Sequence, residues 1–397
     1  MEQAVTPSDT GRADPPRLAA ADALRALCVL IIALYHFWQQ SWLELSLRVG
    51  GRTFTLLPLL RTGYIFVDLM LMLSGFLLYL PYARASLDGS PPPSTSEFYR
   101  KRAVRILPGY LLGVFLPLFA FALPQRLYSG WRDALSDLLP YLTFTQTLFP
   151  NVYQHSRLNA VLWTVGVEAQ AYLAFPLAAR AFSRRPVITY ATMLALGGLY
   201  RLTIWKTLPD LTLWINQAPS FIDVYANGML AAWLFTKWRG RPSAAAERVL
   251  CAIGACGAMF GIWRLVCLQS ALSWEPSGLR EGQAMLRFPL TALGAAWLVM
   301  AERSIAAFRL VFGNALWRWL SGISYALYIW HQWLAVKLRV DWRFPPYQAA
   351  ENPQFSGEQP WQTLYTLTCF VVSLTAAAIV TYCWERPIVK LFKRRRR

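Results

Sequence analysis

The sequence is poor in charge and especially poor in acidic residues. Only 15% of its 397 residues are charged, with 21 Asp and Glu against 39 Lys and Arg. The apolar share is 56% before glycine is counted, whereas soluble domains have about 45–50% with glycine included. The six cysteines form no CxxC pair and no metal-ligand spacing. These features exclude intrinsic disorder, a collagen-like chain and a small disulfide scaffold, and they predict a polytopic membrane protein.

Long apolar stretches divide the chain into candidate membrane spans, each of which needs about 20 mainly apolar residues. Ten stretches qualify: 24–43, 62–82, 106–123, 161–182, 187–205, 219–236, 248–268, 284–302, 319–338 and 362–383. We therefore expect an all-α transmembrane helical bundle of about ten spans, with a cytoplasmic tail at 1–23, a membrane domain at 24–383 and a basic cytoplasmic tail at 384–397. The first 23 residues hold no separate apolar core, so the first span is expected to be an uncleaved anchor.

The basic residues predict the orientation. They lie in short tracts between the apolar runs rather than on one polar domain, which argues against a nucleic-acid partner. If the N-terminus is cytoplasmic, 24 Lys and Arg fall on the cytoplasmic side and 11 on the opposite side. The positive-inside rule therefore predicts that both termini are cytoplasmic.

Several ionisable residues lie inside the expected spans, where each costs roughly 2.5–3.5 kcal/mol unless it is paired or functional. Arg25 and His36 are eleven residues apart, which is about three helical turns, so they share one stripe separated by about 16 Å. Counting residues from the outer ends places Asp68, Glu168 and His331 near the depth of His36. A shared polar cavity is one interpretation. The alternative is that Asp68 and Glu168 pair with arginines to lock helix packing.

A basic segment between the second and third spans is a second candidate site. Arg102 and Arg105 are three residues apart and face the same way on a helix. Two guanidinium groups held together suit a phosphate-bearing ligand. Positive-inside charge alone is the competing interpretation.

At this point the sequence resembles the acyltransferase-3 family of integral membrane acyltransferases, which includes bacterial O-acetyltransferases of surface polysaccharides. The resemblance rests on ordered motifs between residues 22 and 387: the R-x10-H pattern at Arg25 and His36; Ile65-Phe-Val-Asp-Leu-Met-Leu-Met-Leu-Ser-Gly-Phe-Leu77; RxxRIxPxY at Arg102, Arg105, Ile106, Pro108 and Tyr110; Trp163 to Pro176 around Glu168; Ser324, Tyr325, Tyr328 and His331; and Glu385-Arg386-Pro387. Gly166 departs from the usual Ser, and Ala169 stands where a second acidic or polar residue is frequent.

The resemblance implies a mechanism and a set of roles. Family members take acyl-CoA, most often acetyl-CoA, from the cytoplasm and modify acceptors that usually face outward from the cell membrane, such as surface glycans or lipid-linked sugars. Arg25, Arg102 and Arg105 would bind the acyl-CoA co-substrate, without a metal. His36 would be the general base on the acceptor hydroxyl, and Asp68 or Glu168 would orient it. Direct transfer is the expected route, with Ser74 and Cys28 left open as nucleophiles.

Two other functions fit part of the pattern. A glycan or lipid transporter or flippase shares the span count and the buried charges. It does not account for a cytoplasmic arginine pair aligned with a deep histidine. A lipid-linked glycosyltransferase is disfavoured because the loop at 44–61 has Glu44 as its only acidic residue.

Overall fold

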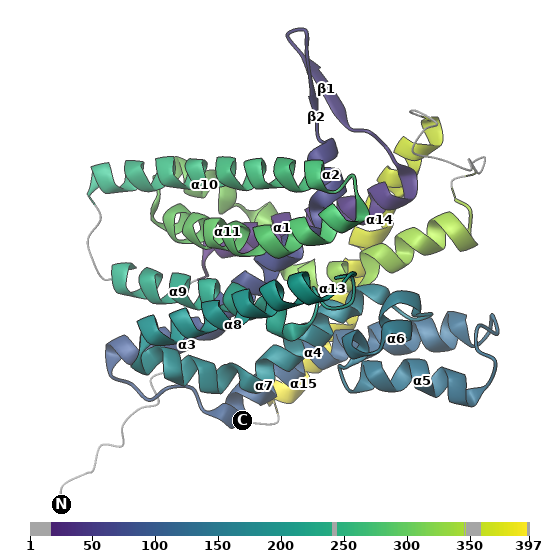
Figure 1. Cartoon of the computed structure of the whole chain (residues 1–397), viewed down its shortest axis with the longest axis horizontal. Helices are drawn as coiled ribbons and strands as arrows, with labels where there is room; N and C mark the ends of the chain where they lie inside the picture. Colours follow the sequence, from purple (N-terminus) through teal and green to yellow (C-terminus); the bar gives the residue numbers. More distant parts are fainter. Residues whose placement is uncertain (1–16, 240–243, 345, 347–358, 395–397) are drawn as a thin grey trace, which may run out of the picture.

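The computed structural model describes residues 17–239, 244–344, 346 and 359–394. Within these residues ten long helices form one bundle, and most of them lie side by side along the horizontal of Figure 1. Their bounds are α1 Ala19–Ser41, α3 Phe66–Asp88, α4 Thr95–Pro117, α7 Trp163–Arg184, α8 Pro186–Thr207, α9 Ile222–Arg239, α10 Ala245–Leu272, α11 Pro276–Arg303, α13 Ala315–Val336 and α14 Pro360–Ile379. Each contains most of one expected span, so the all-α membrane bundle is confirmed.

Eight of the helical segments in the described residues are long and apolar enough to cross a membrane: 19–41, 57–88, 95–122, 160–184, 186–207, 245–272, 277–303 and 360–392. The two expected spans that fall short are α9 and α13. Helix α9 carries Asp223, Lys237 and Arg239, and α13 is rich in Trp and Tyr. Both pack inside the bundle, α9 on α3 and α13 on α1, and neighbouring helices bury Asp223 of α9 and His331 of α13.

Short elements join the long helices. The hairpin β1 Ser46–Val49 and β2 Arg52–Thr55 turns at Gly50 and Gly51, whose φ angles of 58° and 78° favour glycine. The remaining short helices are α2 Leu57–Thr62, α5 Trp131–Leu142, α6 Pro150–His155, α12 Ala306–Phe312 and α15 Arg386–Arg394, with 3-10 turns at Gly63–Ile65, Gln146–Leu148, Ala160–Leu162 and Ala218–Phe221. Single π-helical turns extend three long helices, at Leu118–Ala122, Lys337–Asp341 and Val380–Glu385.

Small residues set the close approach of α3 and α9. A Cβ at Gly228 would overlap the backbone oxygen of Met72, and one at Gly75 would lie 2.6 Å from the backbone oxygen of Tyr225. Close backbone approach at small residues is how membrane helices gain packing energy, since lipid offers no hydrophobic drive to association. This tight pair positions Asp68 and Ser74 of α3 against the rest of the bundle.

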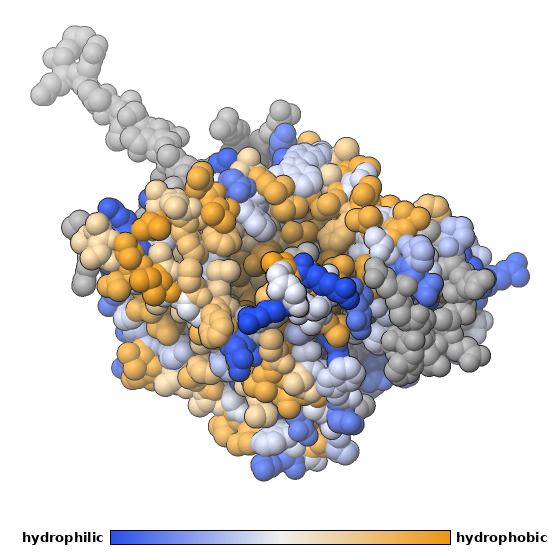
Figure 2. All heavy atoms as spheres, turned by 90° about the horizontal axis from the view of Figure 1, so that it is seen from above, coloured by the Kyte–Doolittle hydropathy of each residue, from blue (hydrophilic) through white to orange (hydrophobic). Residues whose placement is uncertain are grey.

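The outer surface of the bundle is apolar. Figure 2 shows hydrophobic residues spread over the face that it views, with hydrophilic groups between and around them. Exposed apolar side chains follow one face of α10, as at Leu250, Ile253 and Phe260. Helix α14 shows the same at Leu364 and Val371. Such surface is typical of contact with lipid, and the chain is a multi-pass membrane protein. Residues 1–16 and 395–397 of the expected tails lie outside the described residues.

Candidate active site

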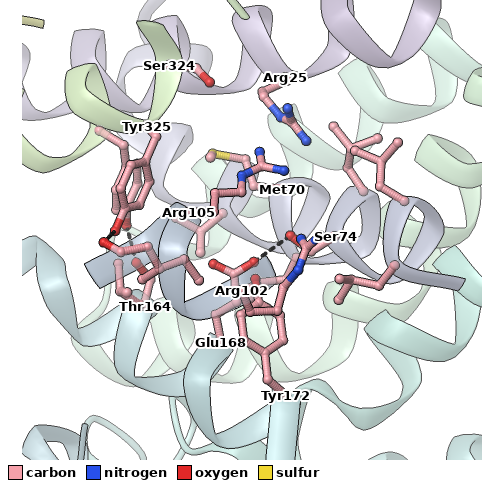
Figure 3. Close-up of a pocket in the computed structure, with 18 residues that line it drawn as sticks. Arg25, Met70, Ser74, Arg102, Arg105, Thr164, Glu168, Tyr172, Ser324 and Tyr325 are labelled. Atoms are coloured by element: carbon pink, nitrogen blue, oxygen red, sulfur yellow. Dashed lines mark hydrogen bonds between the residues drawn. The ribbon is translucent and has the colours of Figure 1, made fainter. Parts of the chain in front are cut away.

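Three of the predicted arginines come together around one cavity. Arg25 of α1 and Arg102 and Arg105 of α4 line it, together with Ser74 of α3 and Glu168 of α7. In Figure 3 the guanidinium groups of Arg25 and Arg105 point into the same space above Glu168. The three-residue spacing of Arg102 and Arg105 therefore places both on the cavity, as predicted. We call this space the arginine cavity.

The arginine cavity carries more positive than negative charge. No carboxylate oxygen in the described part of the chain lies within 4.0 Å of the three guanidinium groups. Glu168 is the only acidic residue in the described lining, and its Oε1 accepts a hydrogen bond of 2.7 Å from Ser74 Oγ (Figure 3). Three half-buried or cavity-facing cations without bound counterions favour an anionic ligand.

His36 lines a second cavity, which we call the histidine cavity. Tyr35, Gln39, Asp68 and Tyr153 also line it. His36 Nδ1 lies 2.8 Å from Gln39 Oε1, and Gln39 Nε2 donates to the Tyr35 hydroxyl at 2.8 Å. Because this amide orientation leaves Oε1 as an acceptor, His36 Nδ1 is the donor and its Nε2 keeps a free lone pair. That tautomer is the one a general base needs.

A second histidine lies beside the first. The ring centroids of His36 and His331 are 5.1 Å apart, which confirms that the two helices bring them to one level. His331 Nδ1 contacts the Leu327 carbonyl oxygen at 3.0 Å, and its buried Nε2 has no hydrogen-bond partner among the described residues. His331 is fully buried and does not itself line the histidine cavity, whose ionisable lining includes His36 and Asp68.

Asp68 lines the histidine cavity but pairs with an arginine. Its Oδ2 accepts a hydrogen bond of 3.2 Å from Arg287 Nε of α11, and their side chains are 3% and 0% exposed. Arg201 of α8 and Asp223 of α9 form a second buried pair, and both arginines contact Ser220. Among the described residues no carboxylate accepts a hydrogen bond from His36, and Gln39 Oε1 is the partner of its Nδ1 instead.

Glu168 does not share the depth of His36, and the expectation of four ionisable residues at one level is wrong for this residue. It belongs to the arginine cavity and is not part of the histidine cavity. Its hydrogen bond from Ser74 Oγ places it beside a residue that lies six positions, or about 9 Å, further along α3 than Asp68.

The arginine and histidine cavities meet at two side chains. Val67 of α3 and Tyr328 of α13 line both. The Tyr328 hydroxyl accepts a hydrogen bond of 2.9 Å from Thr164 Oγ1, and its ring lies 5.6 Å from that of His331. Val67 and Tyr328 therefore form the boundary between a cavity lined with arginines and one lined with histidine.

Four residues of this arrangement were not assigned roles from the sequence. Gln39, which bonds His36, lies one helical turn further along α1 and so on the same face. Tyr328 and Thr164, which meet between the two cavities, were seen only as parts of motifs or not at all. The pairing of Arg287 with Asp68 depends on how α11 packs against α3, which the sequence alone does not give. Among the described residues, no three His, Cys, Asp or Glu side chains gather to hold a metal ion.

Comparison with known proteins identifies the family. The family model described as an acyltransferase domain, Acyl_transf_3, matches residues 18–383. Acyltransferase MdmB of Streptomyces mycarofaciens is 27% identical over 44% of this chain and 43% of its own length. O-acetyltransferase OatA of Staphylococcus aureus is 27% identical over 41% of this chain and 25% of its own length. ORF330 of Acidianus two-tailed virus, provisionally named an acetyltransferase, is 27% identical over 55% of this chain and 58% of its own length. No solved structure matches the chain.

Proposed function

Because this chain belongs to the acyltransferase-3 family, we propose that it transfers an acyl group, in the first instance acetyl, from cytoplasmic acyl-CoA to a hydroxyl group outside the cell membrane. The proposed acceptor is a surface glycan or a lipid-linked sugar. The observation that carries the proposal is the adjacency of the two cavities. An arginine cavity suited to the donor meets a histidine cavity suited to the acceptor at Val67 and Tyr328.

The proposed binding of the acyl donor rests on the charge of the arginine cavity. The phosphates of coenzyme A need cations, and planar guanidinium forks bind phosphate oxygens in pairs. Arg25, Arg102 and Arg105 present three such forks to one cavity, with no carboxylate in ion-pair contact among the described residues. Arg25 and His36 lie on one helix about 16 Å apart along its axis. This separation suits a ligand whose thioester lies far from its phosphates.

The chemical step uses His36 as a general base. The acceptor hydroxyl oxygen attacks the thioester carbonyl carbon while His36 Nε2 takes the hydroxyl proton, and the carbon–sulfur bond then breaks. The imidazolium returns this proton to the departing thiolate, so that free coenzyme A leaves as the thiol. Gln39 holds the Nδ1 proton throughout and fixes the ring.

The two carboxylates act at a distance from His36 in this proposal. Asp68 adds negative charge to the histidine cavity, which favours the imidazolium, although Arg287 offsets much of it. Glu168, held by Ser74, offsets part of the arginine charge beside the path of the thioester. Passage of the thioester arm requires the Tyr328 side chain to turn away from Thr164.

Substitution of His36 tests the proposal. We expect His36→Ala to abolish transfer, measured as acceptor-dependent release of coenzyme A from membranes supplied with acetyl-CoA, while coenzyme A still binds. His155→Ala, at the exposed end of α6, is the matched control and should keep full activity. Near-normal release of coenzyme A by the His36→Ala protein would refute His36 as the general base. A transporter or flippase would release no coenzyme A in either protein.

A further inference from the structure

A third cavity opens beside the arginine cavity at the predicted cytoplasmic end of the bundle. It lies between α4, α13 and the segment from Thr381 to Lys390, and its polar lining includes Arg105, Ser321, Arg386 and Lys390. Arg105, Ser324 and Tyr325 line this cavity and the arginine cavity alike. The two spaces are therefore adjacent along one face of α13. We call the third space the C-terminal cavity.

The C-terminal cavity is cationic. Arg386 and Lys390 are four residues apart, which places them on the same face of α15. Neither has a carboxylate oxygen within 4.0 Å in the described part of the chain, and the Arg386 guanidinium lies 4.2 Å from the centroid of the Tyr382 ring. The one acidic residue of the lining, Glu385, is turned toward α4, where its Oε1 occupies the space that a Cβ at Gly109 would take.

Positive-inside charge alone does not explain this placement. A topology signal needs only to remain outside the membrane on the cytoplasmic side. Arg386 and Lys390 instead line a cavity that shares Arg105 with the arginine cavity, where the proposed function places phosphates of the donor. A row of cations that runs from Arg386 to Arg105 to Arg25 suits a ligand with phosphates at more than one point along its length.

The order of the cavities fixes the direction of such a ligand. In the proposed function the thioester must reach Val67 and Tyr328, at the boundary with the histidine cavity. The opposite end of the donor then lies away from that boundary, toward the C-terminal cavity that shares Arg105, Ser324 and Tyr325 with the arginine cavity. In coenzyme A that opposite end is the adenosine, whose ribose carries a 3′-phosphate with up to two negative charges.

We propose that Arg386 and Lys390 bind the 3′-phosphate of acyl-CoA in the C-terminal cavity, and that the chain uses this contact to distinguish coenzyme A from ligands without a 3′-phosphate. The inference rests on the proposed function, because it takes acyl-CoA as the donor. It adds two residues of α15 to Arg25, Arg102 and Arg105, and Arg105 lines both cavities.

The test compares two ligands that differ only in the 3′-phosphate. Purified full-length protein in detergent is titrated with coenzyme A and with 3′-dephospho-coenzyme A by isothermal titration calorimetry. We expect the unmodified protein to bind coenzyme A roughly ten- to a hundredfold more tightly, which is the usual effect of one or two charge-assisted hydrogen bonds. Arg386→Ala with Lys390→Ala should bind both ligands equally, with the affinity that the unmodified protein has for the dephospho ligand.

Two further variants keep the test decisive. Lys390→Ala alone should lose part of the discrimination while it leaves the Arg386 contact with Tyr382 intact. Arg184→Ala, at the C-terminal end of α7 and outside the lining of these cavities, is the matched loss of one cytoplasmic charge and should keep full discrimination. Equal binding of both ligands by the unmodified protein, or undiminished discrimination in the double variant, would overturn the assignment. If the unmodified protein bound neither ligand, acyl-CoA would not be the donor, and this result would refute the proposed function itself.

Discussion

Removal of the Asp68 carboxylate tests directly how much the buried ion pair with Arg287 contributes to the stability of the protein. Arg287 is fully buried and makes four hydrogen bonds, to Asp68, the Ile215 carbonyl, Ser220 and Asn216. Asp68→Ala leaves this cation without its only carboxylate within 4.0 Å in the described residues. Loss of one partner of a buried ion pair costs about 3–5 kcal/mol, which lowers the ratio of folded to unfolded protein between about a hundredfold and several thousandfold.

Thermal unfolding of the purified protein in detergent measures this loss. Asp68→Asn keeps an oxygen that can accept from Arg287 Nε, so its unfolding midpoint should fall less than that of Asp68→Ala. Asp68→Asn combined with Arg287→Met removes both charges and should recover most of the stability. An Asp68→Ala protein with an unchanged midpoint would refute the idea that this pair holds α3 against α11.

The same double variant separates the two interpretations of Asp68. If Asp68 only locks the helices, the stable double variant should transfer acyl groups at close to the normal rate. If the carboxylate supports the imidazolium of His36 across the histidine cavity, the double variant should stay folded and lose activity. The readout is acceptor-dependent release of coenzyme A, with coenzyme A binding as the check that the donor site is intact.

Three other predictions follow from the packing and the cavities. Arg102→Ala with Arg105→Ala should raise the KM for acyl-CoA far more than that for the acceptor, and equal effects on both would mean that the pair only sets topology. Tyr328→Trp should lower kcat and leave coenzyme A binding unchanged, because a larger side chain narrows the boundary between the arginine and histidine cavities. Tyr328→Phe loses only the hydrogen bond from Thr164 and should have a small effect. A fully active Tyr328→Trp protein would mean that the acyl group does not pass this boundary. Gly228→Ala should destabilise the protein by about 1–3 kcal/mol in thermal unfolding, because its Cβ would meet the Met72 backbone. Gly257→Ala, whose Cβ would meet nothing within 4 Å, should leave the unfolding midpoint unchanged. Equal midpoints for the two variants would refute the close packing of α3 and α9.

The architecture could be predicted because it depends on local composition. The length and apolarity of each stretch identified all ten long helices of the described residues, including α9 and α13, which fall outside the eight segments that are long and apolar enough to span a membrane. The helical spacing of Arg102 and Arg105 placed both on one cavity. The stripe from Arg25 to His36 indicated one helix that carries a residue of each cavity.

The pairing of charges could not be predicted in the same way. Arg201 and Arg287 both lie within expected spans, at 187–205 and 284–302, and only the packing of α3 against α11 brings Asp68 to Arg287. Glu168 was misplaced because its depth was counted along its own helix alone, while its hydrogen bond from Ser74 depends on how α7 packs against α3. Gln39, a polar residue near the end of α1, has a role only because its amide reaches back one turn to His36.

The central claim is that an acyl group crosses from coenzyme A on the cytoplasmic side to an acceptor on the far side by way of His36. The most direct measurement supplies acetyl-CoA with a radiolabelled acetyl group to inside-out and to right-side-out membrane vesicles from cells that make the protein, and counts label in the glycan and lipid fractions. The account predicts label in inside-out vesicles only, and none when the cells carry the His36→Ala protein. Equal labelling of both kinds of vesicle, or labelling that survives His36→Ala, would contradict it.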